Sequence, residues 1–394
     1  MLLLTQCAAC AAPLGLTSGK KCGRCSTRYC GAACQKQHWE VGGHDKLCKK
    51  IKKAGGAEQY HANMKYAEAV AVAAKACVDD TKGQTCYICT QALHWKTKEG
   101  LVRMCACRGT AGFAHVSCLA EQAKILLTEA EENNLSDKVK QTRWERWHDC
   151  SLCEQRYHGV VACALGWACW KIYLGRPEAN VARQMAMSVL GGGLHGAGHN
   201  EDELSVREAE LAMHRRLGGS ESAILTAQSS LANTYQMLGR FEEALHLRRV
   251  VYSGFVRIYG EEHGETSLPA CNYVVSLLTL KHFEEAKSLL RKTVPVARRF
   301  LGESSEITLR MRWNYASVLI RASGGSLDDL REAVTTLEET APTARRVLGG
   351  AHPITGGIEE CLRGARAVRA RVEAASGDMS DIRKLVELMT PGDA

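Results

Sequence analysis

Apolar and polar residues follow one another along most of the chain with the spacing of a helix. The stretch Ala67–Ala76 consists of helix-forming residues with charges on one face, which predicts a helix inside a spacer at 54–80. The segment Leu119–Trp147 has an apolar run at 125–127 followed by acidic residues at 129–132, which predicts a further single helix. We therefore expect a mainly α-helical protein.

A strongly apolar stretch runs from Gly159 to Trp170 and ends at Lys171. A helix that crosses a membrane needs roughly 20 apolar residues. Because this stretch is shorter, it predicts a buried helix and no membrane contact. The first residues, Met1–Thr5, form too short an apolar run for a signal peptide.

The C-terminal half of the chain contains an internal repeat. Phe241-Glu242-Glu243-Ala244 recurs 42 residues later as Phe283-Glu284-Glu285-Ala286. A third unit carries Leu330-Arg331-Glu332-Ala333 after a step of 47 residues, and the extra residues fall at Ser323–Ser326, a turn-forming sequence. Each unit has two helical patterns, and the small alanine at one point of the second helix lets the two helices approach closely.

A weaker unit precedes these three, at Asn200–Leu204, and ends at Leu217-Gly218. Glu203 stands where the other units have alanine, and Gly191-Gly192-Gly193 is expected to interrupt the first helix of this unit. A degraded terminal unit is typical of the cap of a solenoid. The pattern thus predicts about four units within residues 159–374.

The repeat resembles tetratricopeptide repeats of the kinesin-light-chain type, whose Leu-Gly-x-x-His-Pro-x-Thr step matches Leu348–Thr355 in full. The resemblance implies a helical solenoid that binds extended peptides on a concave face lined by first helices. It also implies that Asn272 and Asn314 clamp the peptide backbone, with Ser230 replacing asparagine in the previous unit. The alternative is that these asparagines cap or pack between units.

Cysteine is the residue type that changes this picture most. Fifteen of the 19 cysteines lie before residue 154, mostly as C-x2-C pairs. Such pairs are typical of metal ligands in a reducing compartment rather than of the disulfide framework of a secreted domain. We therefore expect zinc binding and a cytoplasmic or nuclear protein.

The central cluster has the spacing C-x2-C, x15, C-x-C, x7, H-x2-C, x31, C-x2-C. Zinc takes four sulfur or nitrogen ligands in a tetrahedron, so eight such residues can hold two ions. The eight candidate ligands are Cys86, Cys89, Cys105, Cys107, His115, Cys118, Cys150 and Cys153.

Two zinc-finger families share this ligand order, and the spacing favours one of them. The single residue between Cys105 and Cys107, and the seven before His115, resemble the RING-CH (RING-variant) finger. Trp147, three residues ahead of Cys150, is instead a feature of PHD fingers. The RING-CH resemblance implies one zinc on Cys86, Cys89, His115 and Cys118, and another on Cys105, Cys107, Cys150 and Cys153.

RING-type fingers act as ubiquitin ligases by holding a ubiquitin-conjugating enzyme and its ubiquitin near a substrate lysine, which is catalysis by positioning. The resemblance implies docking contacts at Ile88, with Trp144 and Trp147 as the other wall of the groove. Two features depart from the ligase pattern, because Glu154 follows the last ligand where many active RINGs have a basic residue, and no proline follows Cys150. The alternatives are a non-enzymatic adaptor and a PHD-like reader of histone tails.

A second set of eight ligands lies in residues 1–53: Cys7, Cys10, Cys22, Cys25, Cys30, Cys34, His44 and Cys48. The steps Tyr29-Cys30-x3-Cys34-Gln35, Trp39 and His44-x3-Cys48 resemble the MYND finger. The resemblance implies two interleaved structural zinc sites, one on Cys7, Cys10, Cys30 and Cys34 and the other on Cys22, Cys25, His44 and Cys48. It also implies peptide contacts at Gln35 and Trp39, unless Trp39 packs over the second zinc.

The formal net charge of +8 falls to about +2 once four zinc ions and their thiolates are included. This is a weak electrostatic case for a nucleic-acid partner. No catalytic triad, P-loop or dinucleotide fingerprint occurs in the sequence. The fold expected is two small zinc-stapled modules followed by a helical solenoid, with boundaries at 1–53, 54–80, 81–158, 159–374 and a tail at 375–394.

Overall fold

The computed structural model of the protein describes residues 6–12, 14, 19–322, 326–350 and 352–374. The chain divides into two compact units, Met1–Gly219 and Ser220–Ala394. Within the described residues no helix is both long enough and apolar enough to span a membrane. The expected tail at 375–394 and most of the turn insertion at 323–325 lie outside the described residues.

The first unit begins with a two-stranded antiparallel ribbon and continues as helices. Its elements are β1 (Lys20–Lys21), β2 (Arg28–Tyr29), α1 (Ala32–Glu40), α2 (His44–Lys53), α3 (Ala57–Ala76), α4 (Val116–Glu132), α5 (Asp137–Trp144), the 3-10 helix η1 (Glu145–Trp147), α6 (Gly159–Tyr173), α7 (Val181–Gly196) and α8 (Asn200–Arg216).

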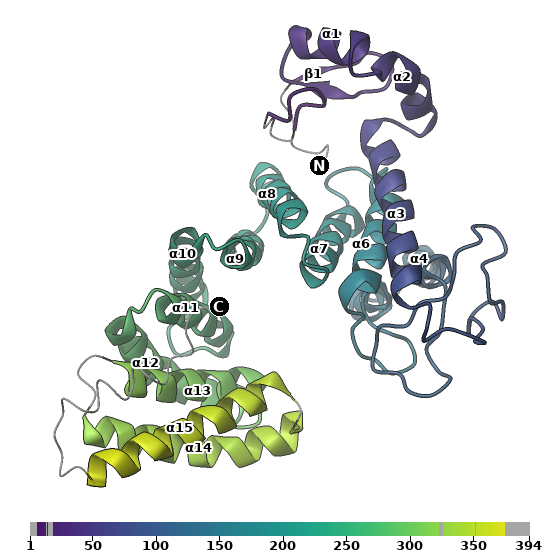
Figure 1. The fold of residues 1–394 in the computed structure, drawn as a ribbon. Helices are drawn as coiled ribbons and strands as arrows, with labels where there is room; N and C mark the ends of the chain where they lie inside the picture. The colour runs from purple at the N-terminus through teal and green to yellow at the C-terminus, as the bar shows by residue number, and fades with distance from the viewer. Residues whose placement is uncertain (1–5, 13, 15–18, 323–325, 351, 375–394) are drawn as a thin grey trace. The chain divides into compact units, whose positions relative to one another are not determined.

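Helix α6 is the centre of this unit and lies between α3 and α7 (Figure 1). It is apolar on nearly all sides, and most of its residues are buried, among them Trp167, Trp170 and Tyr173. One face joins the core of α7 and α8, while Val161 and Leu165 join the core of the central zinc module. The prediction of a buried helix is confirmed.

The same packing moves a domain boundary. The sequence suggested that residues from 159 onward belong with the repeats, but α6, α7 and α8 form one compact unit with the zinc modules. The reason is that α6 has no polar face, so it needs neighbours on both sides. Helix α3 supplies one of them, since Gln59 Nε2 donates to the carbonyl oxygen of Lys171 at 3.1 Å.

The glycine run of α7 does not interrupt the helix, which corrects the expectation from the sequence. A Cβ added at Gly193 would lie 2.5 Å from the carbonyl oxygen of Ala162, and one at Gly191 would lie 2.5 Å from the guanidinium carbon of Arg207. The glycines are therefore positions where α6 and the Arg207 side chain approach the backbone of α7 closely. Close packing compensates for their low helix propensity.

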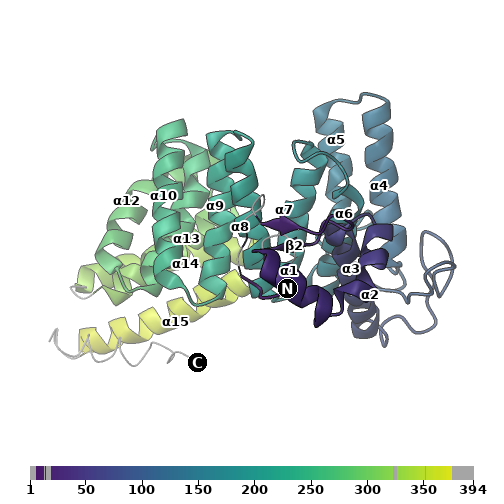
Figure 2. The same ribbon diagram turned by 90° about the horizontal axis from the view of Figure 1, so that it is seen from above.

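The segment Leu119–Trp147 also differs from its expectation, because it forms the hairpin α4–α5 and the short η1 in place of one helix (Figure 2). Helix α4 ends at Glu132, and Asn134 adopts φ 48°. Asparagine tolerates this left-handed conformation better than most residues, and it commonly ends a helix. Ser136 then precedes the first residue of α5.

A cluster of buried charges joins α7 to α8. Glu203, where the other repeat units have alanine, is 1% exposed and contacts both Arg207 and His195. The Nδ1 atom of His195 lies 3.0 Å from Glu203 Oε2, and this hydrogen bond holds the pKa of His195 above its usual range. Glu210 is the second carboxylate on Arg207, at 2.9 Å.

The contact between His195 and Glu203 predicts that the stability of the first unit depends on pH. Since the folded-state pKa of His195 is raised, its contribution to stability is complete below the unfolded pKa, about 6.5, and is lost as pH rises through the folded pKa. His195→Gln is therefore expected to be destabilising near pH 6 and to approach the wild type by pH 8. Unfolding followed by tryptophan fluorescence measures this, because six of the seven tryptophans lie before residue 171. His282→Gln in the other unit is the control; a stability difference for His195→Gln that does not change with pH would contradict the prediction.

The second unit is built from antiparallel helix pairs that follow one another along the chain (Figure 1). Its elements are α9 (Glu221–Met237), α10 (Phe241–Tyr259), the 3-10 helix η2 (Gly264–Thr266), α11 (Ser267–Thr279), α12 (Phe283–Leu301), α13 (Glu306–Arg321), α14 (Leu327–Leu348) and α15 (Pro353–Ala374). The repeated alanines Ala244, Ala286 and Ala333 are fully buried, as close helix packing requires. The weak early unit is α8, which packs on α7 in the first unit.

Candidate metal centres and docking groove

The first zinc module holds two tetrads of ligands, which come from the segment before β1, from the ribbon β1–β2 and its flanks, and from the helices α1 and α2. In each tetrad the four ligand atoms lie within 4.8 Å of one another. One tetrad consists of Cys7, Cys10, Cys30 and Cys34, and the other of Cys22, Cys25, His44 and Cys48. The interleaved arrangement implied by the MYND resemblance is the one that the structure brings together.

Local structure explains why these residues converge. Cys22 and Cys25 lie in the turn between β1 and β2, while His44 and Cys48 lie one turn apart on α2 and share its inner face. The Sγ atoms of Cys22 and Cys48 are 3.9 Å apart, and those of Cys10 and Cys30 are 3.7 Å apart. Two thiolates on one tetrahedral zinc lie about 3.8 Å apart, given Zn–S bonds of about 2.3 Å, so the spacing suits zinc.

The central zinc module holds the other two tetrads. Their ligands come from the start of α4 and from the loops before and after the hairpin α4–α5. They are Cys86, Cys89, His115 and Cys118, and Cys105, Cys107, Cys150 and Cys153. The pairing is cross-braced, as the RING-CH resemblance implied. Each tetrad joins segments far apart in the sequence, so two metals would hold this loop-rich region together.

His115 shows the arrangement that a zinc-binding histidine requires. Its Nδ1 lies 3.4 Å from Cys89 Sγ and 3.6 Å from Cys118 Sγ, while its Nε2 lies 3.4 Å from the carbonyl oxygen of Ala92. A hydrogen bond on the second nitrogen fixes the ring and leaves Nδ1 free for metal. Burial also lowers the pKa of His115, which favours the neutral form that binds metal.

The thiols themselves require a cation. Burial and neighbouring thiols raise the pKa of Cys48 to about 11 and that of Cys107 to about 11. At Cys22 burial raises the pKa, but backbone N–H groups of Arg24 and Cys25 outweigh it and lower the pKa overall. Three or four sulfurs this close ionise together only beside a positive charge, and a divalent cation supplies it. The donor set therefore fits zinc.

A groove lies beside the first tetrad of the central module, with a volume of about 380 Å³. Ile88, in the loop between Cys86 and Cys89, is 36% exposed, Ile125 on α4 is 46% exposed, and Trp95 is 68% exposed. The lining residues are Ile88, Cys89, His94, Trp95, Ser117, Cys118, Glu121, Gln122, Ile125 and Leu126. Exposed apolar side chains gathered around a concave surface mark an interaction site.

Trp144 and Trp147 are not part of this groove, which corrects the expectation from the sequence. They are 3% and 0% exposed and pack against Tyr173 of α6, with ring centroids 5.4 Å and 5.7 Å away. The other wall is formed by Trp95 and Ile125, which the spacing of the cysteines could not identify. Trp95 lies in a loop without a regular pattern, and the sequence marks Ile125 only as an apolar helix position.

The predicted peptide contacts occupy different environments. Trp39 on α1 is 40% exposed, and its ring meets the edge of the His44 ring at 5.8 Å, so it both packs over the second tetrad and presents surface. Gln35 is half-buried beside it. Asn272 on α11 is half-buried and Asn314 on α13 is 9% exposed. Their role in peptide binding stays a prediction.

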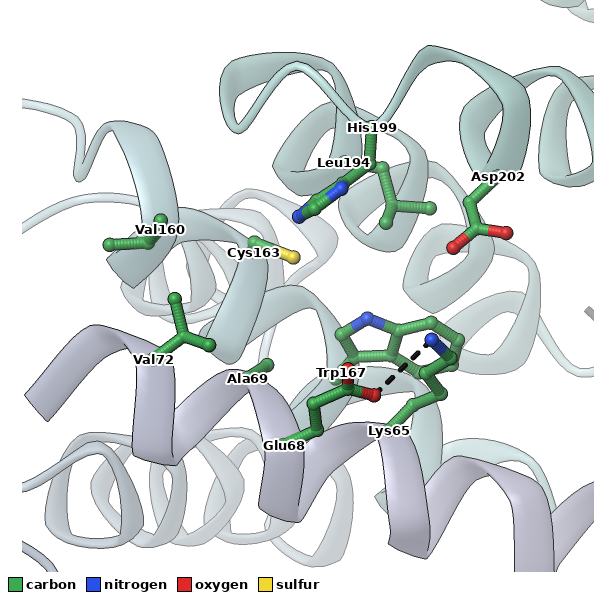
Figure 3. A pocket seen from close by; sticks show the side chains of 10 residues that line it. All are labelled: Lys65, Glu68, Ala69, Val72, Val160, Cys163, Trp167, Leu194, His199 and Asp202. Atoms are coloured by element: carbon green, nitrogen blue, oxygen red, sulfur yellow. Dashed lines mark ion pairs between the residues drawn. The ribbon is translucent and has the colours of Figure 1, made fainter. Parts of the chain in front are cut away.

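A smaller pocket of about 130 Å³ lies between α3, α6 and the start of α8 (Figure 3). The indole of Trp167 forms one side, with His199 and Asp202 facing it from the other (Figure 3), and Lys65 pairs with Glu68 at 3.2 Å. Burial raises the pKa of the Cys163 thiol to about 11. This cysteine is therefore a neutral packing residue at neutral pH rather than a nucleophile.

Two family models match the chain, the MYND finger at residues 7–48 and the tetratricopeptide repeat at residues 223–299. The chain carries a MYND finger and tetratricopeptide repeats. The first is a zinc-binding module, and modules of both kinds interact with proteins. The RING-CH resemblance of residues 86–153 stays a prediction.

Three solved structures are among those to which the chain is similar. One is the Podosopora anserina putative kinesin light chain with nearly identical TPR-like repeats, at 20% identity and a TM-score of 0.40, covering 52% of this chain and 92% of that one. Another is BtubC (BKLC) from P. vanneervenii, at 15% identity and a TM-score of 0.34, covering 66% and 92%. A Rap protein complexed with competence and sporulation factor has 12% identity and a TM-score of 0.37, covering 65% and 72%. No curated protein matches the sequence.

Proposed function

We propose that the central zinc module docks a ubiquitin-conjugating enzyme and that the protein is a RING-type ubiquitin ligase. The MYND finger and the repeats recruit the proteins to be modified. The observation that carries the proposal is the apolar groove at Ile88, Trp95 and Ile125, beside the tetrad of Cys86, Cys89, His115 and Cys118.

The tetrad supports a rigid groove. Ile88 lies between two ligands, and Ile125 lies two turns after Cys118 on the same helix, α4. One metal would therefore fix both walls, and a docking surface held this way loses little entropy on binding. Glu99 secures the loop of Trp95 to the same helix, since its Oε1 accepts from the Ser117 backbone N–H at 2.7 Å.

The chemistry of a RING-type ligase asks only for positioning. The conjugating enzyme supplies the thioester, and the ligase holds it so that a substrate lysine attacks. A groove without a nucleophile suits this role, because its two cysteines, Cys89 and Cys118, belong to the tetrad. Glu154 still departs from the ligase pattern, and the nearest basic side chain, Arg156, is 81% exposed and lies 3.8 Å from Asp149.

The alternative function is a non-enzymatic adaptor. A MYND finger and tetratricopeptide repeats on one chain favour it, since both interact with proteins and neither requires a conjugating enzyme. In that case the Ile88 groove would bind a protein without ubiquitin transfer.

Ile88→Ala is expected to slow ubiquitin discharge from a loaded conjugating enzyme about tenfold or more, because the central apolar contacts of an interface provide most of its binding energy. A panel of conjugating enzymes, each charged with ubiquitin and mixed with the zinc-loaded full chain, measures this. Val139→Ala is the matched control, since Val139 on α5 is equally exposed at 37% and lies outside the groove. A zinc-loaded wild type inert with the whole panel would favour the adaptor, and an active Ile88→Ala would exclude this groove as the docking site.

A further inference from the structure

A pocket of about 590 Å³ opens between α7, the start of α6 and residues 148–158, which follow η1. Its volume is within the range of about 300–1,000 Å³ that is typical of small-molecule sites. It shares no lining residue with the groove at Ile88 or with the pocket at Trp167, and none of its lining residues is a zinc ligand. The pocket therefore has no role in the function proposed above.

One wall of the pocket is an apolar stripe on α7, the helix that packs beside α6 (Figure 1). Met185 and Val189 line it and are half-buried, and Gly192 and Gly196 continue the same face of the helix. Ala162 of α6 adds a further apolar side chain. Because methionine adapts its shape to an irregular neighbour, this wall suits a flexible aliphatic group.

Gly192 keeps this wall open. A Cβ added there would meet no heavy atom within 4 Å, whereas Gly191 and Gly193 are occupied closely by Arg207 and by the backbone of α6. No neighbour in the described part of the chain therefore requires glycine at position 192, although glycine is unfavourable inside a helix. A ligand that lies against the backbone of α7 explains the glycine.

The polar part of the pocket is basic. Its lining contains Arg156 and His158 and no acidic residue. The Arg156 side chain is 81% exposed, and its carboxylate neighbour, Asp149, lies 3.8 Å from Nε. Both NH₂ groups of this guanidinium are thus available to an anion, and guanidinium and carboxylate groups pair well because both are planar.

The N-terminus of α6 adds positive potential at the same place. The helix begins at Gly159, directly after His158, and it has neither a side-chain cap nor an acidic residue in its first turn. A Cβ added at Gly196 would lie 3.8 Å from the backbone nitrogen of Gly159. Since Gly196 lines the pocket, the uncapped N–H groups of α6 lie at its edge, where they and the helix dipole attract a negative charge.

We propose that this pocket binds a small organic acid with an aliphatic chain. The carboxylate lies beside Arg156 and the first turn of α6, and the chain lies along the stripe on α7. Val189 and Gly196 are about 10 Å apart along the helix, at a rise of about 1.5 Å per residue, which suits a chain of about eight carbons. The ligand class goes beyond the proposed ligase function and does not depend on it.

Isothermal titration calorimetry of the zinc-loaded full chain tests the proposal. The probes are octanoate and octan-1-ol, which has the same chain without the charge. The wild type is expected to bind one octanoate per chain, about tenfold more tightly than octan-1-ol, because the carboxylate gains charge-assisted hydrogen bonds. Hexanoate, which is two methylenes shorter, is expected to bind about tenfold more weakly than octanoate.

Gly192→Leu is expected to weaken octanoate binding about tenfold or more, because the leucine side chain fills the pocket. The variant is expected to fold, since the space beside Gly192 is open and leucine is the better helix former. Gly356→Leu is the matched control, because Gly356 lies on α15 and also has no heavy atom within 4 Å of an added Cβ. Circular dichroism verifies that both variants are folded.

Arg156→Gln separates the charge from the chain. It is expected to weaken octanoate binding about fivefold and to leave octan-1-ol binding unchanged. Lys82→Gln is its control, because the Lys82 side chain is 74% exposed and pairs with Asp79 at 2.9 Å, outside the pocket.

Three results would overturn the proposal: a folded Gly192→Leu that binds octanoate like the wild type, a wild type that binds none, and a wild type that binds several molecules. Equal binding of octanoate and octan-1-ol would exclude an acid as the ligand. Ile88→Ala is expected to bind octanoate normally, so a failure of this proposal and a failure of the ligase proposal are distinguishable.

Discussion

Cys150→Ser is expected to remove one zinc ion and unfold much of the first unit. Cys150 is fully buried, and its Sγ lies 3.7 Å from that of Cys107 in the second tetrad of the central module. The same residue belongs to the core that contains Val161 and Leu165 of α6. Structural zinc contributes on the order of 10 kcal/mol or more to folding, which is comparable to the whole stability of a domain. Losing it therefore affects more than the finger.

The measurement is the zinc content per chain together with tryptophan fluorescence. The wild type is expected to contain four zinc ions, and Cys150→Ser three or fewer, with an early unfolding transition of the tryptophan-rich first unit. Cys361→Ser on α15 is the matched control, because Cys361 lies in none of the four tetrads and is expected to leave four zinc ions bound. A fully zinc-loaded Cys150→Ser with unchanged unfolding would show that the second tetrad binds no structural metal.

Trp147→Ala is expected to destabilise the first unit by about 3–5 kcal/mol, the usual cost of removing a buried tryptophan. The ring of Trp147 is fully buried. Its centroid lies 6.3 Å from the ring centroid of Trp144 and 5.7 Å from that of Tyr173. Removal leaves a cavity between η1 and α6 that helices tied to zinc sites cannot easily close.

Trp95→Ala provides the contrast, because the Trp95 side chain is 68% exposed. Its effect on stability is expected to stay within about 0.5 kcal/mol. The free energy of unfolding of both variants is measured by chemical denaturation followed by circular dichroism, because each variant removes a tryptophan and so changes the fluorescence signal. If Trp147→Ala were as stable as Trp95→Ala, Trp147 would not be a core residue, and the interpretation of this tryptophan as a docking residue would return.

The metal ligands were predictable because their chemistry is local. A C-x2-C turn or an H-x3-C helical turn brings two ligands together whatever the rest of the fold does. Only the choice of which pairs share a metal is a tertiary question, and the four groups that the family resemblances implied are the four that the structure brings together. The repeat was predictable for a similar reason, since it repeats the same short helix pair and each unit meets only its neighbours.

The groove was only half predictable. Ile88 could be found because it lies between two ligands, but Trp95 lies in a loop and Ile125 on a helix, and no spacing relates them. Trp144 and Trp147, which the sequence suggested as docking residues, are of a residue type that is common at docking surfaces. Their burial depends on α6, which follows them in the chain and covers them.

The amino-acid sequence by itself determined that the protein is mainly helical, that it binds zinc through clustered cysteines and histidines, and that it contains a repeat array. These properties depend on periodicity and on short spacings. The tertiary structure decided that α6 to α8 belong with the zinc modules, that the glycines of α7 lie inside a helix, and that Gly192 and Arg156 line one pocket. Each of these depends on contacts between segments distant in the chain, where burial and close approach of backbones outweigh local propensity.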